Sequence, residues 1–259
     1  MTATAHTSPH SPTSPSTPGP WLTRLRLNPF SRPVQRDLRN AAALHRRLMT
    51  LVPDGLGDNP RSKAGLLFRL DTDGTRGPVL LVQSRIPPDP TRLPQGYADV
   101  HAKDMNTLLD ALRPGLAVRY RLLGNTVRRC GRNSTAGRWK QAIPLHGEEA
   151  NAWWEERASA SGLALHTVLS DSSDSLSTWH KDRQHATPAP IPSTGPGAAD
   201  HRNEHSERNV LVPRQTTLFD GTATIRDAEA LRSALLNGIG RSKSYGCGLL
   251  SLAPTGLDT

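Results

Sequence analysis

This sequence has very little cysteine, no long apolar run and no stretch typical of a secretory leader. Only two cysteines, Cys130 and Cys247, occur in 259 residues, which excludes a disulfide framework and a zinc site of four thiolates. No stretch approaches the ~18 consecutive apolar residues of a transmembrane helix. Residues 1–20 contain no apolar segment typical of a secretory signal. We therefore expect a cytoplasmic protein with reduced thiols and no membrane partner.

Aromatic and apolar residues are also scarce. Aromatic residues make up 4% of the chain, and no expected strand carries the interleaved aromatics that stack single-stranded bases. Hydrophobic residues make up 35%, which indicates a folded protein with disordered segments. Composition predicts these segments as a disordered tail over 1–20 and a flexible insertion over about 171–209. The remainder is long enough for two compact domains.

Acidic residues are almost absent from two windows, 21–47 and 119–140. Together the windows hold fourteen basic residues and one acidic residue, Asp37, whereas the rest of the chain is mildly acidic. The overall net charge of +9 therefore resides in these windows. This pattern favours a polyanionic partner, and the dominance of arginine over aromatic residues favours a structured RNA duplex held through its phosphates.

The order of the expected elements predicts an α+β fold. The second half contains the segments 117–123 (strand), 148–161 (helix), 163–169 (strand), 216–225 (strand), 227–237 (helix) and 248–252 (strand). Strand–helix–strand–strand–helix–strand is the ferredoxin-like order. The first half begins in the same way, with a strand over 21–27, a helix capped by Asp37 and ending near Val52, and a hairpin over 66–70 and 79–83. We expect two tandem ferredoxin-like domains related to RNA-recognition modules, over 21–113 and 116–257.

A glycine-rich segment, GIGRSKSYGCGLLSLAP, follows the last expected helix. It matches neither a dinucleotide-binding fingerprint nor a P-loop. Gly238 and Gly240 could let the backbone approach an RNA phosphate, which Arg241 and Lys243 would bind. Alternatively, the segment is a helix C-cap followed by a loop that packs on the sheet. Composition leaves both interpretations open.

Several motifs in one order resemble the CasE family of CRISPR-associated endoribonucleases. They are WLTRLRLNP, ALHRRLM, LLFRL, VLLVQS, YRLLGN, IPL, LFDGTATI and the glycine-rich segment. The resemblance implies two tandem ferredoxin-like domains that bind the repeat hairpin of the CRISPR precursor transcript. It implies cleavage at the 3′ base of the stem without a metal or a cofactor, leaving a 2′,3′-cyclic phosphate. The enzyme would then stay on its RNA beside other subunits of the Cascade complex.

His45 matches the catalytic histidine of that family. A histidine with an ordinary pKa could take a proton from the ribose 2′-OH or give one to the leaving 5′-oxygen. Nearby RNA phosphates would raise its pKa and favour the acid role. Members of the family often carry a tyrosine three residues earlier, where this chain has Ala42. The further catalytic candidates are Arg46, Arg47, Lys243 and Tyr245.

The RNA-binding candidates are basic residues of both windows and residues of the glycine-rich segment. They are Arg24, Arg26, Arg39, Arg47, Arg121, Arg128, Arg129, Arg132, Arg138, Lys140, Gly238, Gly240, Arg241 and Lys243. No metal site is expected, since the pairs His180/His185 and His201/His205 lie in the flexible insertion. Two other functions stay open: a non-cleaving subunit that binds an RNA stem-loop, motivated by Ala42, and a general RNA-binding scaffold.

Overall fold

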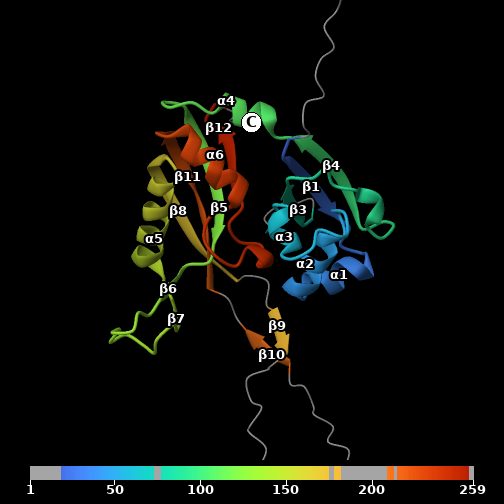
Figure 1. The fold of residues 1–259 in the computed structure, drawn as a ribbon, viewed down its shortest axis with the longest axis horizontal. Helices are drawn as coiled ribbons and strands as arrows, with labels where there is room; N and C mark the ends of the chain where they lie inside the picture. Colours follow the sequence, from blue (N-terminus) through green and yellow to red (C-terminus); the bar gives the residue numbers. More distant parts are fainter. Residues whose placement is uncertain (1–18, 73–76, 175–177, 182–208, 213–214, 257–259) are drawn as a thin grey trace, which may run out of the picture.

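The computed structural model describes residues 19–72, 77–174, 178–181, 209–212 and 215–256. The predicted tail and the central part of the predicted insertion lie outside these residues. The described part forms two α+β units side by side, each built on a four-stranded antiparallel sheet (Figure 1). The predicted pair of ferredoxin-like domains is confirmed.

The first domain has the strand order β2-β3-β1-β4. Its strands are β1 (Trp21–Leu27), β2 (Leu67–Asp71), β3 (Val79–Ser84) and β4 (Ala98–Asp104). Its helices are α1 (Arg32–Leu38), α2 (Ala41–Met49) and α3 (Pro60–Lys63). Between β3 and β4 there is only the short 3-10 helix η1 (Pro90–Arg92) where a ferredoxin-like unit has its second helix. The first domain therefore has the ferredoxin-like sheet but lacks the second α-helix of that order.

The segment before α2 differs from the prediction. Asp37 does not cap a helix but lies buried in α1, and Asn40 caps α2 by accepting hydrogen bonds from the backbone N–H groups of Ala42 and Ala43. An asparagine at this position satisfies two amides that have no partner inside the helix. The apolar stripe of α2 and the turn after it is buried, and it consists of Ala41, Leu44, Leu48, Leu51 and Val52.

The second domain has the complete ferredoxin-like order, with its strands arranged as β12-β5-β11-β8. Its strands are β5 (Ala117–Gly124), β8 (Leu163–Asp174), β11 (Gln215–Ile225) and β12 (Leu250–Pro254). Its helices are α5 (Gly147–Ala160), α6 (Ala228–Asn237) and the 3-10 helix η2 (Lys243–Tyr245). Trp154 and Phe219 are fully buried in its core.

Three shorter elements lie outside the two sheets. A hairpin of β6 (Val127–Arg129) and β7 (Ala142–Pro144) projects from the second domain (Figure 1). The helix α4 (Asn106–Ala111) joins the domains, and its neighbours Met105 and Leu112 are buried in the core of the second domain. The ends of the predicted insertion are strands: β8 continues to Asp174, and β9 (Thr178–Lys181) pairs with β10 (Asn209–Val212).

Candidate active site

His45 lies in the middle of α2, beside the apolar stripe. Its ring stacks on Phe68 of β2, with ring centroids 6.4 Å apart and planes inclined by 20°. The side chain is half-buried, and its Nδ1 atom is buried without a hydrogen-bond partner. Nε2 is therefore the ring nitrogen that can meet a substrate.

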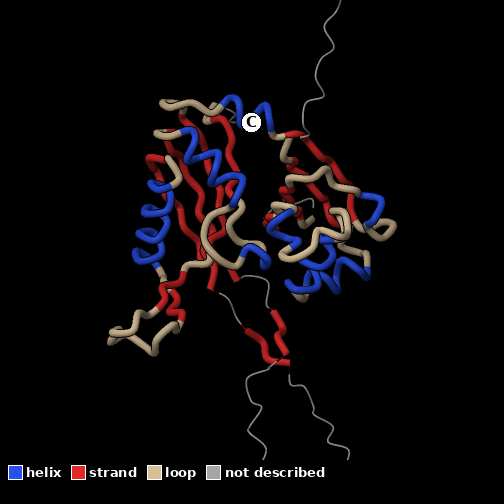
Figure 2. Tube along the Cα trace, viewed as in Figure 1, coloured by secondary structure: helices blue, strands red, loops and turns tan. Residues whose placement is uncertain are grey.

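The glycine-rich segment brings Lys243 across the domain boundary to this helix. It leaves α6 of the second domain, and η2 lies against α2 and β2 of the first (Figure 2). The approach is close at Gly246, where a Cβ would lie 3.3 Å from Phe68. Phe68 therefore contacts both His45 and the loop that carries Lys243. Tyr245 lies in the same 3-10 turn as Lys243.

Arg61 adds a second cationic side chain, besides Lys243, near His45. Burial lowers the pKa of His45, and the positive charge of Arg61 lowers it further. The pKa of Lys243 is lowered by the same two causes in the same order. Arg61 is itself partly buried, which lowers the pKa of its guanidinium, and its Nη1 atom donates to the Leu66 carbonyl at 3.0 Å. Two positive side chains therefore lie near a histidine that the protein keeps neutral.

This arrangement suits a reaction in which negative charge develops on a phosphate group in the transition state. Two cations can stabilise a phosphorane, and a neutral imidazole can accept a proton. The lowered pKa of His45 favours the base role, in contrast to the acid role expected from substrate phosphates alone. Sequence analysis missed Arg61, whose only signal is its place in the short basic helix PRSK just before β2.

The structure favours packing as the role of Gly238 and Gly240. Gly238 ends α6 with a φ of 72°, and a Cβ there would lie 2.8 Å from Leu67. Gly240 has a φ of 75°, and a Cβ there would lie 3.2 Å from Trp153. Both glycines therefore allow a close approach to protein side chains, and their approach to an RNA phosphate stays a prediction.

The arginines that follow His45 face away from it. Arg46 and Arg47 line a groove of about 550 Å³ between α1 and α2, and His45 is not part of its lining. Arg47 donates to the buried Asp37 at 2.8 Å and lies over the Tyr97 ring. Arg47 is therefore engaged in an internal ion pair, and its role in catalysis or RNA binding stays a prediction. Arg46 is exposed on this groove, and Arg39 is exposed at the end of α1 but does not line it.

Most basic side chains of the second window lie on the β6–β7 hairpin and are exposed to solvent. Its exposed basic side chains are Arg128, Arg129, Arg132, Arg138 and Lys140. Trp139, at 54% exposure, lies beneath two of them: the Arg132 guanidinium is 5.3 Å and the Lys140 ammonium 4.1 Å from its ring. This aromatic anchor was not predicted from the sequence. The hairpin presents a dense positive surface that suits a phosphate backbone.

The remaining candidates lie on sheet faces and beside the hairpin. Arg24 is exposed and Arg26 half-buried on the face of β1 that is opposite the first core. Arg121 donates through its Nε to Asp220 at 2.7 Å on the sheet of the second domain, and its contact with RNA stays a prediction. Arg241 is exposed and lines a groove of about 440 Å³ between the hairpin and α5.

The described residues offer neither a cluster of metal ligands nor a membrane-spanning helix. Within those ranges, no group of three or more His, Cys, Asp or Glu side chains could hold a metal ion. His185, His201 and His205 lie outside the described residues, and His180 is in β9. No helix in the described part of the chain is long and apolar enough to span a membrane.

Comparisons with known proteins match this architecture over nearly all of the chain. The model of a family described as CRISPR associated protein matches residues 20–254. The CRISPR-associated endoribonuclease Cse3 of Thermus thermophilus is 32% identical over 243 residues, which cover 90% of this chain and 100% of the relative. The structure of Thermus thermophilus Cse3 bound to an RNA representing a pre-cleavage complex matches with a TM-score of 0.67 and 31% identity, covering 91% and 100% of the two chains. A chain of a CRISPR RNA-guided surveillance complex in a pre-nicking state matches with a TM-score of 0.61 and 35% identity, covering 90% and 99%. The chain therefore belongs to the CasE family of CRISPR-associated proteins, as its motifs predict.

Proposed function

We propose that this chain is a cytoplasmic endoribonuclease that binds the hairpin of a CRISPR repeat and cuts the precursor transcript at the 3′ base of the stem. The observation that carries the proposal is the placement of a neutral, half-buried His45 near Lys243 and Arg61. The similarity to Cse3, whose structure holds an RNA, supports the choice of substrate. The similarity to a chain of a surveillance complex supports retention of the product beside other Cascade subunits.

The reaction needs one base, one acid and charge stabilisation, and no metal. His45 Nε2 accepts the proton of the ribose 2′-OH, and the 2′-oxygen attacks the adjacent phosphorus. Arg61 and Lys243 offset the charge that develops on the phosphorane oxygens. The bond from phosphorus to the 5′-oxygen then breaks, and that oxygen takes a proton from the Lys243 ammonium. The products are a 2′,3′-cyclic phosphate and a 5′-hydroxyl, and proton exchange with water restores both side chains.

Binding relies on a separate surface, the β6–β7 hairpin. Its exposed arginines are suited to phosphates and to the shape of a duplex groove, since no strand of the described sheets presents a row of exposed aromatic residues. The groove between the hairpin and α5, which Arg241 also lines, lies on the path from this surface to the loop of Lys243.

The test is to incubate the purified chain with a panel of labelled CRISPR repeat hairpins in EDTA. We expect one hairpin to be cut once, at the 3′ base of its stem. The same hairpin with a 2′-deoxyribose at that position should bind with equal affinity and stay intact. His45→Ala should bind the hairpin but leave it whole. Tight, sequence-specific binding without cleavage would instead support the non-cleaving subunit, and binding indifferent to hairpin sequence would support the general scaffold.

A further inference from the structure

Both ends of the loop that carries Lys243 are fixed to the first domain. At the start of the loop, Gln83 Nε2 donates to the Leu235 carbonyl at 2.8 Å, and Arg85 donates to the Asn237 side chain at 2.7 Å. Both donors come from β3 or the residue after it, and both acceptors lie at the end of α6. The position of the first domain therefore determines where the loop begins.

At the end of the loop, Arg69 of β2 makes the corresponding contact. The residue is 2% exposed, among the most buried large side chains of the described chain. Its Nε and Nη2 atoms donate to the two carboxylate oxygens of Asp71, at 2.7 and 3.1 Å. Its Nη1 atom reaches the second domain, where it donates to Ser251 Oγ at 2.9 Å and to the Leu249 carbonyl at 3.3 Å.

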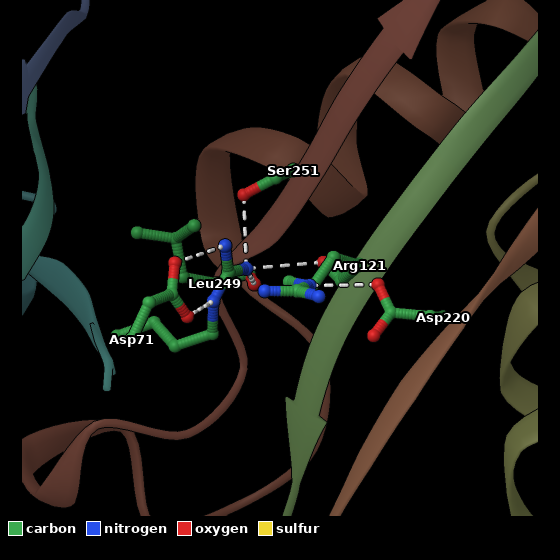
Figure 3. A network of polar contacts seen from close by, with 6 residues as sticks. Asp71, Arg121, Asp220, Leu249 and Ser251 are labelled. Carbon is green, nitrogen blue, oxygen red and sulfur yellow. Dashed lines mark hydrogen bonds and ion pairs between the residues drawn. The ribbon is translucent and has the colours of Figure 1, made fainter. Parts of the chain in front are cut away.

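A third acceptor in the second domain is the backbone carbonyl of Arg121, 3.2 Å from the same nitrogen. Figure 3 shows Asp71 on one side of this network and Leu249, Ser251 and Arg121 on the other, with Arg121 continuing to Asp220. The two-point pairing with Asp71 fixes the plane of the guanidinium, so that Nη1 is directed at its three acceptors. A lysine has a single ammonium group and could not hydrogen-bond to Asp71 and to the acceptors of the second domain in the same way.

The geometry of the loop transmits this contact to Lys243. Leu249 follows Gly248, whose N–H donates to the Leu123 carbonyl at 2.8 Å and whose carbonyl accepts from the Ile239 N–H at 2.9 Å. The bond from Ile239 joins the start of the loop to its end, and the bond to Leu123 holds that end on β5. Gly248 also lies directly beneath Lys243, because a Cβ there would lie 3.4 Å from the lysine Cγ. A shift of Leu249 would therefore also move the backbone of Gly248, which contacts the Lys243 side chain.

We infer that Arg69 is a positioning residue for cleavage, which holds the end of the glycine-rich loop against β2 so that Lys243 stays beside His45. The inference rests on the proposed function, in which both side chains serve one reaction. Arg69 itself is buried and does not touch the RNA. Its loss would displace the lysine without removing any group that contacts the substrate, and a displacement of about 1 Å can lower a rate on the order of 10²-fold.

The experiment is a double-mutant cycle under single-turnover conditions at saturating hairpin RNA. We expect Arg69→Gln to lower the cleavage rate on the order of 10²-fold, with the Kd for the hairpin changed by less than about twofold. In a Lys243→Ala background the same substitution should cost less than about twofold, because the lysine through which it acts is gone. Equal losses in both backgrounds would overturn the inference, and so would a loss confined to Kd.

Two further variants separate positioning from general stability. Arg92→Gln is the matched control, because Arg92 also pairs with an aspartate and donates to a carbonyl, at Val52, but within the first domain. It should destabilise the protein without changing the cleavage rate at saturating RNA. Where Arg69→Gln does not fold, Ser251→Ala removes one of the acceptors and should give a smaller rate loss of the same kind, again absent in the Lys243→Ala background.

A readout that does not require cleavage is the NMR titration of the His45 ring in the free protein. Because η2 packs against α2, which carries His45, displacement of the loop in Arg69→Gln should expose the ring and raise its pKa toward the ordinary value, and Arg92→Gln should not. An unchanged titration in Arg69→Gln would contradict the inference even if the wild type proved not to cut. Wild-type cleavage together with a fully active Arg69→Gln would remove the inference and leave the proposed function standing.

Discussion

The two basic windows, 21–47 and 119–140, each hold seven basic residues but lie in different settings. In the first window the Arg47 side chain is 20% exposed and neutralises the buried Asp37. In the second, the Arg128 side chain is 57% exposed, on a hairpin that projects from the sheet. Charge density in a sequence therefore does not by itself indicate a binding surface, because burial decides which cations remain available to a partner.

The same comparison separates chemistry from binding. The first window surrounds His45, which a protein environment of buried and positive groups keeps neutral. The second window holds no group of the proposed reaction. Substitution of His45 should therefore act on the cleavage rate and substitution of Arg47 on folding, whereas substitutions in the second window should act on affinity and its dependence on salt.

The largest expected effect is that of His45→Ala. Removal of a general base typically lowers a rate by about 10²- to 10⁴-fold, and we expect this loss in single-turnover cleavage with an unchanged Kd. His146→Ala is the matched control, because His146 is exposed at the root of the basic hairpin. It should leave the rate at saturating RNA unchanged. Comparable rate losses in the two variants would refute the separation between the windows.

The next effect is on stability, and it compares two neighbouring arginines of α2. Arg47→Gln leaves the carboxylate of Asp37, which is 3% exposed, without its principal cation. Breaking a buried ion pair in this way costs about 3 kcal/mol in the free energy of unfolding. Arg46→Gln, on an exposed side chain, should cost no more than about 0.5 kcal/mol. Urea denaturation of both variants measures the difference, and equal costs would show that Arg47 is not a structural residue.

A smaller effect is expected on the β6–β7 hairpin. Arg132→Gln and Arg138→Gln should each weaken hairpin binding and reduce the slope of log Kd against log salt by about one, because each removes one phosphate contact. The cleavage rate at saturating RNA should stay the same. Arg113→Gln, an exposed arginine outside both windows, is the control and should leave the slope unchanged. A slope that is insensitive to both hairpin variants would place the RNA elsewhere.

Much of the fold could be predicted from the sequence, because local patterns determine it. The core stripe of α2 and the ferredoxin-like order of the second domain follow from hydrophobic periodicity and turn residues. The division between α1 and α2 could not be predicted, because the tertiary pair of Asp37 with Arg47 overrides the capping preference of an aspartate.

The candidate site was predictable only in part. His45 and Lys243 were identified from motifs, but Arg61 was not, since nothing in its neighbourhood in the sequence distinguishes it from a solvated basic helix. Its importance arises from the docking of the two domains, which brings Arg61 near Asn237 at the end of α6, where both line a cavity of about 30 Å³. Contacts between residues so far apart in the sequence have no local signature.

The smallest expected effect is a shift in the pH dependence of cleavage in Arg61→Gln, which is separate from the rate loss at every pH that follows from the role of Arg61 at the phosphorane. His45 must be neutral to accept the 2′-OH proton, so the rate rises with pH through the pKa of His45. Arg61 lowers that pKa by its positive charge. Arg61→Gln should therefore raise it and move the rising limb of the pH–rate profile to higher pH, so that activity falls most on the acidic side. Lys63→Gln, which changes an exposed cation of the same short helix, should leave the limb in place. Because both variants lose one positive charge from α3, a shift shared by the two would assign the effect to the general field of the first domain, whereas a shift in Arg61→Gln alone would assign it to the site.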